Sequence, residues 1–494
     1  MKKTTLCGAL CVVAALCASG AARIAVDFDT ETGPVKPVHG TGQGPLLGWC
    51  DFSLFGYLKD AGIPYARLHD VGGPFGKNIY VDIPNIFRDF EADENDPKSY
   101  DFTYTDLYLN ALVANGVEPY FRLGVTIENS VRQTKKAYRL HPPKDFAKWA
   151  RICEHVVRHY TEGWADGFRH KITYWEIWNE PDDFPDYRNA MWYGTWRQYC
   201  ELYEAASKHL KACFPGLKIG GYGRCTAHGV TARCEGRPIP ENEVYREKCF
   251  EEFCAFVRER RCPLDFFSFH GYIPPEMVGP HADFHRKALD AIGYTRTELH
   301  LNEWACGGPR REDWWQTPSV SSKIAAYLVA LQASAADAAM VYDARCQVSR
   351  YSLLFDPIRN RPAKPYWAFR AFNTLYRLGR EVKVSLPGGQ GADGLWAVAA
   401  KGEAGGAVMI VNDRKEARAL ELDAGGRAVA SCRITDAGRN EEVCALPGEL
   451  PPESVLLVLF GTASIRPVDG DRRDGSVRRP PAPTTSNRSA TSPT

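Results

Sequence analysis

The chain has almost no net charge, because 61 lysine and arginine residues stand against 60 aspartate and glutamate residues, which leaves +1. Proteins that bind nucleic acid usually carry a basic excess, so the balance gives no indication of such a partner. The apolar run near the start, residues 6–16, is too short to cross a bilayer as a helix. We therefore expect neither a nucleic-acid partner nor a membrane span.

Familiar cofactor and metal motifs are also lacking. The glycine-rich residues 40–44 have no Lys-Ser/Thr pair and no dinucleotide spacing after them, which favours a close-packed strand end. The 16 cysteines fit no convincing zinc-ligand spacing. Cys225 and Cys234 flank a loop-like segment and are candidates for a disulfide, although buried free thiols with one or two bridges are favoured. We expect no metal ion and no organic cofactor.

The first residues read as an export signal. Lys2 and Lys3 precede the apolar run, and small residues at 19–21 form a cleavage site. We therefore expect a signal peptide over residues 1–22 and a secreted or periplasmic mature chain. A lipid anchor on Cys17 is the weaker alternative, because the residue before it suits lipidation poorly.

Strands and helices alternate over residues 39–378, in eight units. Their number and order predict an α/β fold, a (β/α)8 barrel. The expected strands are residues 40–44, 64–70, 117–124, 172–182, 217–221, 264–272, 297–304 and 338–343, and the expected helices are residues 52–61, 100–115, 145–160, 195–214, 242–260 (with Asn242 as N-cap), 281–292 and 321–336.

A second domain is predicted after the barrel. Short alternating runs separated by Gly, Asn and Asp over residues 379–465 indicate a β-sandwich that braces the barrel. Residues 23–38 contain a strand that precedes the barrel, so we expect it to join this β-domain. Residues 466–494 have almost no apolar side chain and are expected to be disordered.

Two of the barrel strands end in Asn-Glu. Residues 172–182 read ITYWEIWNEPD and residues 297–304 read TELHLNEW. Barrel enzymes place their chemistry at the carboxyl ends of strands, so Glu180 and Glu303 should face each other there. Cleavage of a glycosidic bond needs one carboxylic acid and one carboxylate. We predict Glu180 as the proton donor, its pKa raised by burial and by Glu303, and Glu303 as the nucleophile.

A third acidic residue lies deeper on the same strand. Glu176 precedes Glu180 by four residues, so both side chains point to the same side of the strand. Inside a barrel Glu176 needs a cationic partner, for which Arg67 and Arg122 are candidates. For Arg67 two roles stay open, an internal ion pair and direct support of an ionised Glu303.

The motifs around these residues resemble glycoside hydrolase family 39, which contains β-xylosidases and α-L-iduronidases. The WNEP at residues 178–181 and the NEW at residues 302–304 match the acid/base and nucleophile strands of its clan, the retaining barrel glycosidases. The YDF at residues 100–102, followed by a helix and VEPYF, is also similar. The resemblance covers the barrel and extends to the β-sandwich.

The resemblance implies further site residues. Asn179 matches the residue that holds the sugar 2-hydroxyl, Arg67 and His69 lie on the second-strand motif, and His270 and Tyr272 match a pair on the sixth strand near the nucleophile. We expect His69 and His270 to be hydrogen-bonding groups of the pocket rather than metal ligands, because no recognisable ligand set surrounds them in the sequence.

Aromatic residues and departures from the family bear on the sugar. Trp304 directly follows the nucleophile and is the best candidate for stacking on a sugar ring. Gln43 stands where many relatives have histidine, and the eighth strand, MVYDARC, lacks the tryptophan common in the clan. These departures leave the sugar specificity open.

The expected function is that of a secreted retaining glycoside hydrolase, exo-acting on a β-xyloside-like pyranoside of an oligosaccharide or polysaccharide. An endo-acting β-glycanase or a transglycosidase of the same clan is one alternative. A carbohydrate-binding protein that has lost catalysis is another, against which the intact Glu180 and Glu303 argue. The sequence leaves the oligomeric state open.

Overall fold

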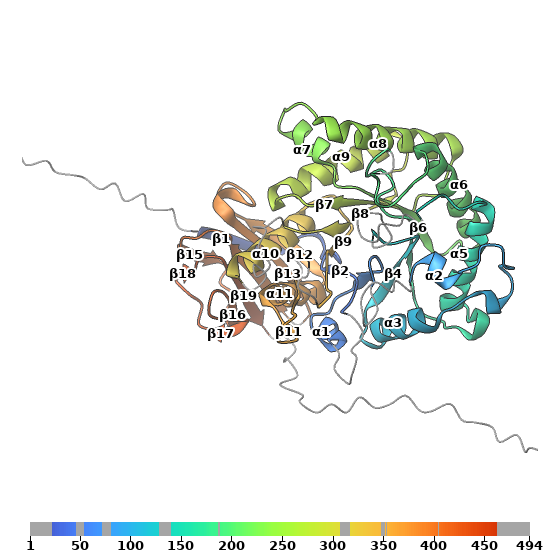
Figure 1. Ribbon diagram of the computed structural model, residues 1–494. Coiled ribbons are helices and arrows are strands. Elements are labelled where there is room, and N and C mark those ends of the chain that lie inside the picture. The colour runs from blue at the N-terminus through green and yellow to red at the C-terminus, as the bar shows by residue number, and fades with distance from the viewer. Residues whose placement is uncertain are drawn as a thin grey trace, which may run out of the picture.

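The computed structural model describes residues 22–45, 54–71, 81–127, 140–185, 188–306, 317–346, 351, 353–403 and 405–461. Within these ranges the chain forms a barrel ringed by helices and, beside it, a β-sheet domain (Figure 1). The predicted signal peptide, the Cys17 anchor and the tail over residues 466–494 lie outside the described residues and stay predictions.

The barrel consists of eight parallel strands that close in the order β2-β3-β4-β5-β6-β7-β8-β9, which confirms the predicted (β/α)8 fold. Its strands are β2 (Gly40–Gly42), β3 (Tyr65–Arg67), β4 (Glu118–Leu123), β5 (Tyr174–Ile177), β6 (Lys218–Arg224), β7 (Phe266–Gly271), β8 (Glu298–Trp304) and β9 (Ala338–Val341). The helices around and after them are α1 (Phe55–Asp60), α2 (Ile83–Ile86), α3 (Thr103–Ala114), α5 (Phe146–Thr161), α6 (Trp196–Cys213), α7 (His228–Cys234), α8 (Glu241–Arg260), α9 (Val278–Ala291), α10 (Pro318–Ala333) and α11 (Lys364–Leu378), with 3-10 turns η1 (Pro97–Ser99), η3 (Trp164–Asp166), η4 (Pro275–Met277) and η6 (Ala392–Gly394).

Local sequence explains where several helices begin. Asp145 accepts a hydrogen bond from the backbone of Lys148 and caps α5. Thr195 and Gln198 form a reciprocal capping box at the start of α6. The prediction of Asn242 as the cap of α8 is wrong, because the helix already begins at Glu241, after a proline whose restricted φ suits the position before a helix.

The predicted disulfide is also wrong. The segment between Cys225 and Cys234 is not a loop, since helix α7 occupies most of it. Cys225 is buried, Cys234 is exposed, and every cysteine that the structure describes is a free thiol.

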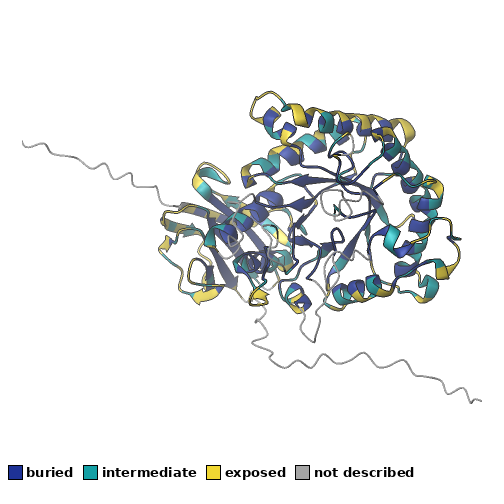
Figure 2. Cartoon of the chain, in the orientation of Figure 1, coloured by how far each residue is buried: buried dark blue, intermediate teal, exposed yellow. Residues whose placement is uncertain are grey.

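The inside of the barrel is layered, as parallel barrels require. Tyr120 of β4, Phe266 of β7 and Met340 of β9 pack together, with Tyr65 and Tyr174 against them. The next inward positions toward the carboxyl ends of these strands are polar and carry the site described below. Figure 2 shows the strands buried and the helices exposed on their outward faces. The apolar layer therefore closes one end of the barrel and leaves the other for chemistry.

The second domain is a nine-stranded sheet with the order β17-β16-β19-β14-β13-β12-β1-β15-β18. The predicted β-sandwich thus takes the form of one curled sheet around its own apolar core. Its strands are β1 (Ala22–Pro34), β12 (Arg380–Ser385), β13 (Leu395–Gly402), β14 (Gly405–Asn412), β15 (Arg418–Asp423), β16 (Val429–Thr435), β17 (Glu442–Cys444), β18 (Glu449–Leu450) and β19 (Ser454–Gly461), and a small hairpin of β10 (Phe355–Asp356) and β11 (Arg361–Pro362) precedes α11.

The N-terminal strand belongs to this sheet, as the sequence predicts. β1 pairs antiparallel with β12 and parallel with β15, so it lies inside the sheet although it precedes the whole barrel. In Figure 1 it is the blue strand among the orange strands of the C-terminal domain.

The two domains share an interface along α10 and α11. The outward side chains of β13, β14 and β19, such as Trp396 and Leu457, belong to the same apolar cluster as the helices of the barrel. Ser322 and Lys323 of α10 both bind Asp413, which follows β14. The sheet domain therefore braces the barrel.

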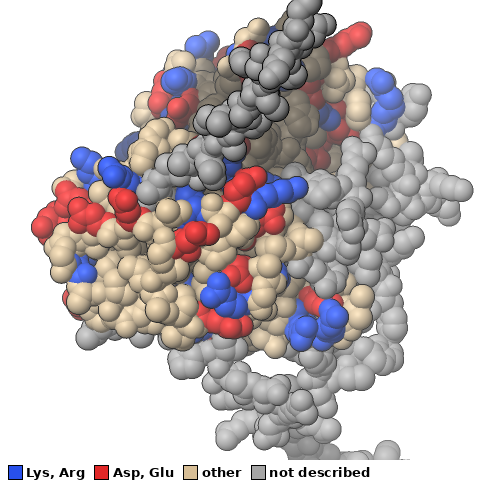
Figure 3. Space-filling view, turned by 90° about the vertical axis from the view of Figure 1, so that its left-hand side faces the viewer, with Lys and Arg blue, Asp and Glu red and all other residues tan. Residues whose placement is uncertain are grey.

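Charged side chains of both signs lie on the described surface of the sheet domain (Figure 3). Basic and acidic side chains are intermixed on the described part of the face that this domain presents. Among the described helices, none combines the length and apolarity that crossing a bilayer requires.

A substitution of Phe28 in β1 tests whether the first strand contributes to the stability of the C-terminal sheet domain. Its ring is 3 % exposed and packs edge-on against Phe460 of β19, with centroids 5.2 Å apart. We expect Phe28→Ala to lower the free energy of unfolding of the sheet domain by about 3–5 kcal/mol, measured by thermal and urea denaturation. Asp29→Ala, at an exposed neighbour on the same strand, should change stability by less than about 0.5 kcal/mol. Equal losses from both variants would contradict the placement of β1.

Candidate active site

Glu180 is presented by a strained turn at the end of β5. Trp178 and Glu180 both have left-handed backbone conformations, with φ of 71° and 44°, a geometry that stores strain and is frequent at functional sites. Two backbone hydrogen bonds hold the turn, from Trp178 N to Leu123 O at 2.7 Å and from Glu180 N to Gly223 O at 2.9 Å. Both neighbouring strands, β4 and β6, thus fix the direction of the Glu180 side chain.

Glu303 lies near the end of β8, the seventh strand of the barrel, whereas β5 is the fourth. A register shift in the pairing of β7 with β8 places His270 opposite Glu303; such irregularities often lie next to active sites. The Tyr272 hydroxyl donates to Glu303 Oε1 at 2.6 Å, and Arg67 Nη1 donates to Oε2 at 3.0 Å. Both carboxylate oxygens therefore have a donor.

The two glutamates approach each other across His270. His270 Nδ1 lies 2.6 Å from Glu180 Oε1 and 3.6 Å from Glu303 Oε2. An oxygen of Glu180 and an oxygen of Glu303 lie within 4.8 Å of each other. Carboxyl groups about 5–5.5 Å apart are typical of retaining glycosidases, and inverting enzymes need about 6.5–9.5 Å. The geometry corresponds to the retaining arrangement.

Arg67 connects the polar groups beneath the pair. Its guanidinium is fully buried and donates from Nε to Glu176 Oε2 at 2.7 Å, from Nη1 to Glu303, and from Nη2 to Asn179 Oδ1 at 2.5 Å. Burial opposes the positive charge, but Glu176 and Glu303 raise the pKa of Arg67. The two roles left open by the sequence, an internal ion pair and support of Glu303, are thus both present in one side chain.

Glu176 is ionised inside the barrel because its partners are complete. Besides Arg67, the Ser268 hydroxyl and the Asn302 amide donate to its Oε1 at 2.6 and 2.7 Å. Burial would raise its pKa, yet these contacts lower it below the ordinary value. The other candidate cation, Arg122, binds Asp82 instead at 2.8 Å.

The two glutamates have different electrostatic surroundings. Burial, followed by the negative charge of Asp183, raises the pKa of Glu180 to about 7. Burial and the charge of Glu180 also raise the pKa of Glu303, but Arg67 and the Tyr272 hydroxyl oppose the rise. Glu180 therefore keeps its proton at near-neutral pH, as an acid catalyst must, whereas Glu303 has donors that favour its ionised form. Asp183 adds to the repulsion between Glu180 and Glu303, which raises the pKa of Glu303.

A cluster behind Glu180 was not predicted. Asp183 accepts from Arg246 Nη2 of α8 at 2.7 Å, and the Cys225 thiol, just after β6, lies 3.8 Å from the same carboxylate. The backbone N–H of Cys225 donates to Asp182 Oδ1 at 3.1 Å. Asp182 and Asp183 follow the NEP directly, which is a signal in the sequence, but only the fold brings Cys225 and Arg246 to them.

The other predicted residues lie around the pair. Asn179 is buried and bound by Arg67, and His69 Nε2 lies 3.3 Å from Asp70 Oδ1 with its Nδ1 unbonded. Burial, followed by the charge on Arg122, lowers the pKa of His69 well below its ordinary value, so this imidazole is neutral. Gln43 is fully buried after β2, and neither atom of its amide has a partner among the described residues.

Trp304 corrects one prediction. Its indole is fully buried and stacks on Tyr327 of α10 at 4.2 Å with an interplanar angle of 4°. A ring covered on both faces has no surface left for a sugar, so Trp304 packs β8 against α10.

Gly223 is required by the crowding at this point of β6. Its φ is +64°, and a Cβ there would lie 3.3 Å from Arg67 Nη2, Asn179 Oδ1 and His270 Nε2. The backbone of β6 can thus lie directly against the polar groups only because the residue has no side chain.

Two groups of side chains in the described part of the chain have the spacing of metal ligands. One is Glu180, His270 and Glu303. The Arg67 guanidinium already supplies positive charge to Glu303 at 3.0 Å, so this group fits an acid pair better than a cation site. The other, Glu154, His209 and Cys213, lies on the outer helices.

Comparisons with known proteins agree with this geometry. The model of the family described as Glycosyl hydrolases family 39 matches residues 58–291. A β-xylosidase of Geobacillus stearothermophilus is 27 % identical over 202 residues, which are 40 % of this chain and 35 % of the relative. An α-L-iduronidase of Canis lupus familiaris is 28 % identical over 175 residues, 35 % of this chain and 24 % of the relative. The solved structure of a glucosidase from Croceicoccus marinus has a TM-score of 0.70 at 19 % identity, covering 90 % of this chain and 100 % of that chain.

The fold and the paired acidic strand ends place the protein among (β/α)8 barrels with a carboxylate pair at the carboxyl ends of the strands. Within that class, the predicted resemblance to glycoside hydrolase family 39 is confirmed. The matches to the two curated relatives span about a third or less of the length of those proteins.

Asp183→Asn tests the electrostatic origin of the Glu180 pKa. Removing this negative charge eases ionisation of Glu180, so its pKa should fall below the present value of about 7. The pKa can be followed by an infrared titration of the carboxyl band, assigned by its loss in Glu180→Gln. Asp106→Asn, at a carboxylate that binds His159 and Tyr160 on the outer helices, is the control. A rise in the pKa of Glu180 in Asp183→Asn would contradict the assignment.

Proposed function

We propose that the protein is a retaining glycoside hydrolase in which Glu180 is the acid/base and Glu303 the nucleophile. The observation that carries the proposal is the approach of their carboxylate oxygens to within 4.8 Å, at the ends of the fourth and seventh barrel strands. The match to family 39 over residues 58–291 supports the same reaction. The intact pair also argues against a carbohydrate-binding protein without catalysis.

In the first step the carboxylate of Glu303 attacks the anomeric carbon while Glu180 donates its proton to the leaving oxygen. The glycosidic C–O bond breaks, an ester bond to Glu303 forms, and the alcohol departs. The pKa of Glu180, about 7, provides the proton at near-neutral pH. Tyr272 and Arg67 hold Glu303 in place for attack, since each donates to one of its oxygens.

In the second step Glu180 acts as the base. Once Glu303 is an ester, its negative charge is gone and Glu180 is ionised. Glu180 takes a proton from water, the resulting hydroxide attacks the anomeric carbon, and Glu303 leaves as a carboxylate with overall retention. Burial lowers the pKa of His270 to about 4, so its imidazole is neutral. It therefore forms a hydrogen bond with Glu180 and not an ion pair.

A β-xyloside is the substrate we propose. β-D-Xylosides and α-L-iduronides, named for the two relatives, share their configuration from C1 to C4 and differ by a carboxylate at C5. Arginine is the side chain that binds such a carboxylate most strongly, through two parallel hydrogen bonds. Among the described residues, the two arginines whose charges act on Glu180 already bind carboxylates: Arg67 contacts Glu176 and Glu303, and Arg246 contacts Asp183. These pairings favour an uncharged pyranoside.

We further propose exo action and export. The β-xylosidase relative supports the former, with an endo-glycanase of the same clan as the alternative. The signal-like residues 1–22 support a secreted or periplasmic location. Both are tested directly, by analysing products from defined xylo-oligosaccharides and by sequencing the N-terminus of the mature protein.

Azide rescue assigns the two glutamates. Glu180→Ala should lower turnover of an aryl glycoside by about 10²–10⁴-fold, and Glu303→Ala by at least as much. With azide, Glu303→Ala should give the glycosyl azide of inverted configuration and Glu180→Ala that of retained configuration, both read by NMR.

Glu276→Ala is the matched control, because Glu276 is an exposed glutamate just beyond the sixth barrel strand. It should keep the rate of the unmodified enzyme. Retained turnover in Glu303→Ala without azide would overturn the proposal.

The sugar is tested by comparing aryl β-D-xyloside, β-D-glucoside and α-L-iduronide at equal concentration. We expect the highest kcat/KM on the xyloside and the lowest on the iduronide, because Arg67 and Arg246, the described arginines that act on the pair, already bind carboxylates. Preference for the iduronide would show that one of these arginines exchanges its partner for substrate.

A further inference from the structure

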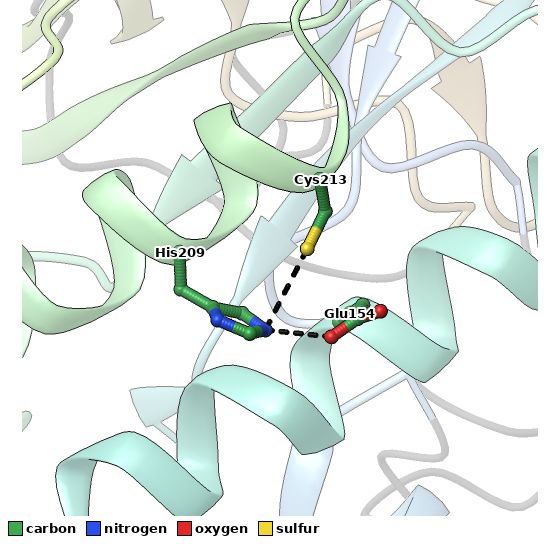
Figure 4. Close-up of side chains that lie close together, drawn as sticks. All are labelled: Glu154, His209 and Cys213. Atoms are coloured by element: carbon green, nitrogen blue, oxygen red, sulfur yellow. Dashed lines mark hydrogen bonds and ion pairs between the residues drawn. The ribbon is translucent and has the colours of Figure 1, made fainter.

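Two outer helices bring three metal-ligating side chains together. Glu154 lies on α5, while His209 and Cys213 lie one turn apart on α6, so that both point toward α5 (Figure 4). His209 Nε2 lies 2.6 Å from Glu154 Oε2 and 3.8 Å from Cys213 Sγ. The three ligand atoms all lie within 4.8 Å of one another.

We propose that Glu154, His209 and Cys213 form a site for Zn²⁺ that clips α5 to α6. A carboxylate, an imidazole and a thiolate are the three ligand types that Zn²⁺ takes from proteins. Tetrahedral Zn²⁺ at its usual bond lengths holds a nitrogen and a sulfur ligand about 3.6 Å apart, close to the observed Nε2–Sγ separation of 3.8 Å. The shorter Nε2–Oε2 contact must open by about 0.8 Å for Zn²⁺ to lie between the two atoms.

The surroundings suit a metal-bound carboxylate. Arg158 donates from Nε to Glu154 Oε1 at 2.8 Å and leaves Oε2 directed at His209. Such a hydrogen bond to the second oxygen is common where a carboxylate ligates a metal, because it fixes the orientation of the ligand. The charge of Arg158 is offset by a second partner, Glu162, the residue that follows the end of α5.

The site is partly open to solvent. The side chains of His209 and Glu154 are 31 % and 14 % exposed. A fourth coordination position is thus available to water, which completes a tetrahedral shell around three protein ligands. A cation can enter without unfolding either helix.

The clip lies at the opposite end of the barrel from Glu180. Glu180 follows the carboxyl end of β5, whereas Cys213 is the last residue of α6, shortly before β6 begins at Lys218. Helices in this fold run antiparallel to the strands, so the end of α6 lies near the amino ends of the strands. Binding of Zn²⁺ should therefore act on the stability of the α5–α6 pair and leave the chemistry of the glutamates unchanged.

The experiment uses the full-length protein, freed of metal with a chelator and kept reduced. Titration with Co²⁺, a spectroscopic substitute for Zn²⁺, should give one equivalent of a tetrahedral d–d spectrum with a thiolate-to-cobalt charge-transfer band. Zn²⁺ should displace the cobalt. Excess Zn²⁺ should raise Tm by a few degrees, since a ligand that binds the folded state stabilises it by mass action.

The variants separate this site from other thiols and from the catalytic pair. Cys213→Ser should remove the charge-transfer band, and His209→Ala should weaken Co²⁺ binding at least tenfold and abolish the Tm shift. Cys234→Ser, at an exposed thiol elsewhere, should leave all three signals unchanged.

Two results would overturn the proposal. One is a protein that gives no tetrahedral cobalt spectrum. The other is a spectrum that persists in the Cys213→Ser and His209→Ala variants while glycoside turnover is lost, because the cation would then lie at Glu180, His270 and Glu303.

Discussion

One buried guanidinium organises the polar interior of this barrel. Arg67 binds Glu176, Glu303 and Asn179 at once, and so connects the third, fifth and eighth strands of the chain at the level where the barrel opens. Removing such a charge would leave two buried carboxylates without a counter-ion, which costs several kcal/mol, about 3–5 for a broken buried pair. The same side chain therefore stabilises the fold and holds the nucleophile, so stability and chemistry are not separable at this position.

The fold could be predicted because every unit of the barrel repeats one pattern. The alternation of apolar strands with amphipathic helices predicts eight barrel units. The alternating residues 23–28 predict one more strand, which precedes the barrel and belongs to the second domain. What the pattern could not supply was pairing between distant strands. The second domain closes as one curled sheet rather than two, and helix α7 occupies a segment that lacks the length and periodicity of a helix in the sequence.

The site residues could be predicted where a recognisable motif lies at the end of a strand. They could not be predicted where the side chain comes from a helix or strand that is distant in the sequence. Glu180 and Glu303 follow from two Asn-Glu tips, but Arg246 reaches Asp183 from α8, with nothing in its own neighbourhood to mark it. Trp304 failed for a related reason: a position in the sequence does not tell which neighbour covers a ring, and here Tyr327 does.

The position of β1 in the C-terminal sheet determines the order in which the two domains can fold during synthesis. Its partners β12 and β15 begin at Arg380 and Arg418, so the whole barrel must be synthesised before the first strand can pair. Until then the apolar side of β1 has no core to join. The barrel is complete earlier, and the sheet domain that braces it is the last part to form. A product truncated before Arg380 would therefore carry a finished barrel with an unpaired first strand, because both partners of β1 would be missing.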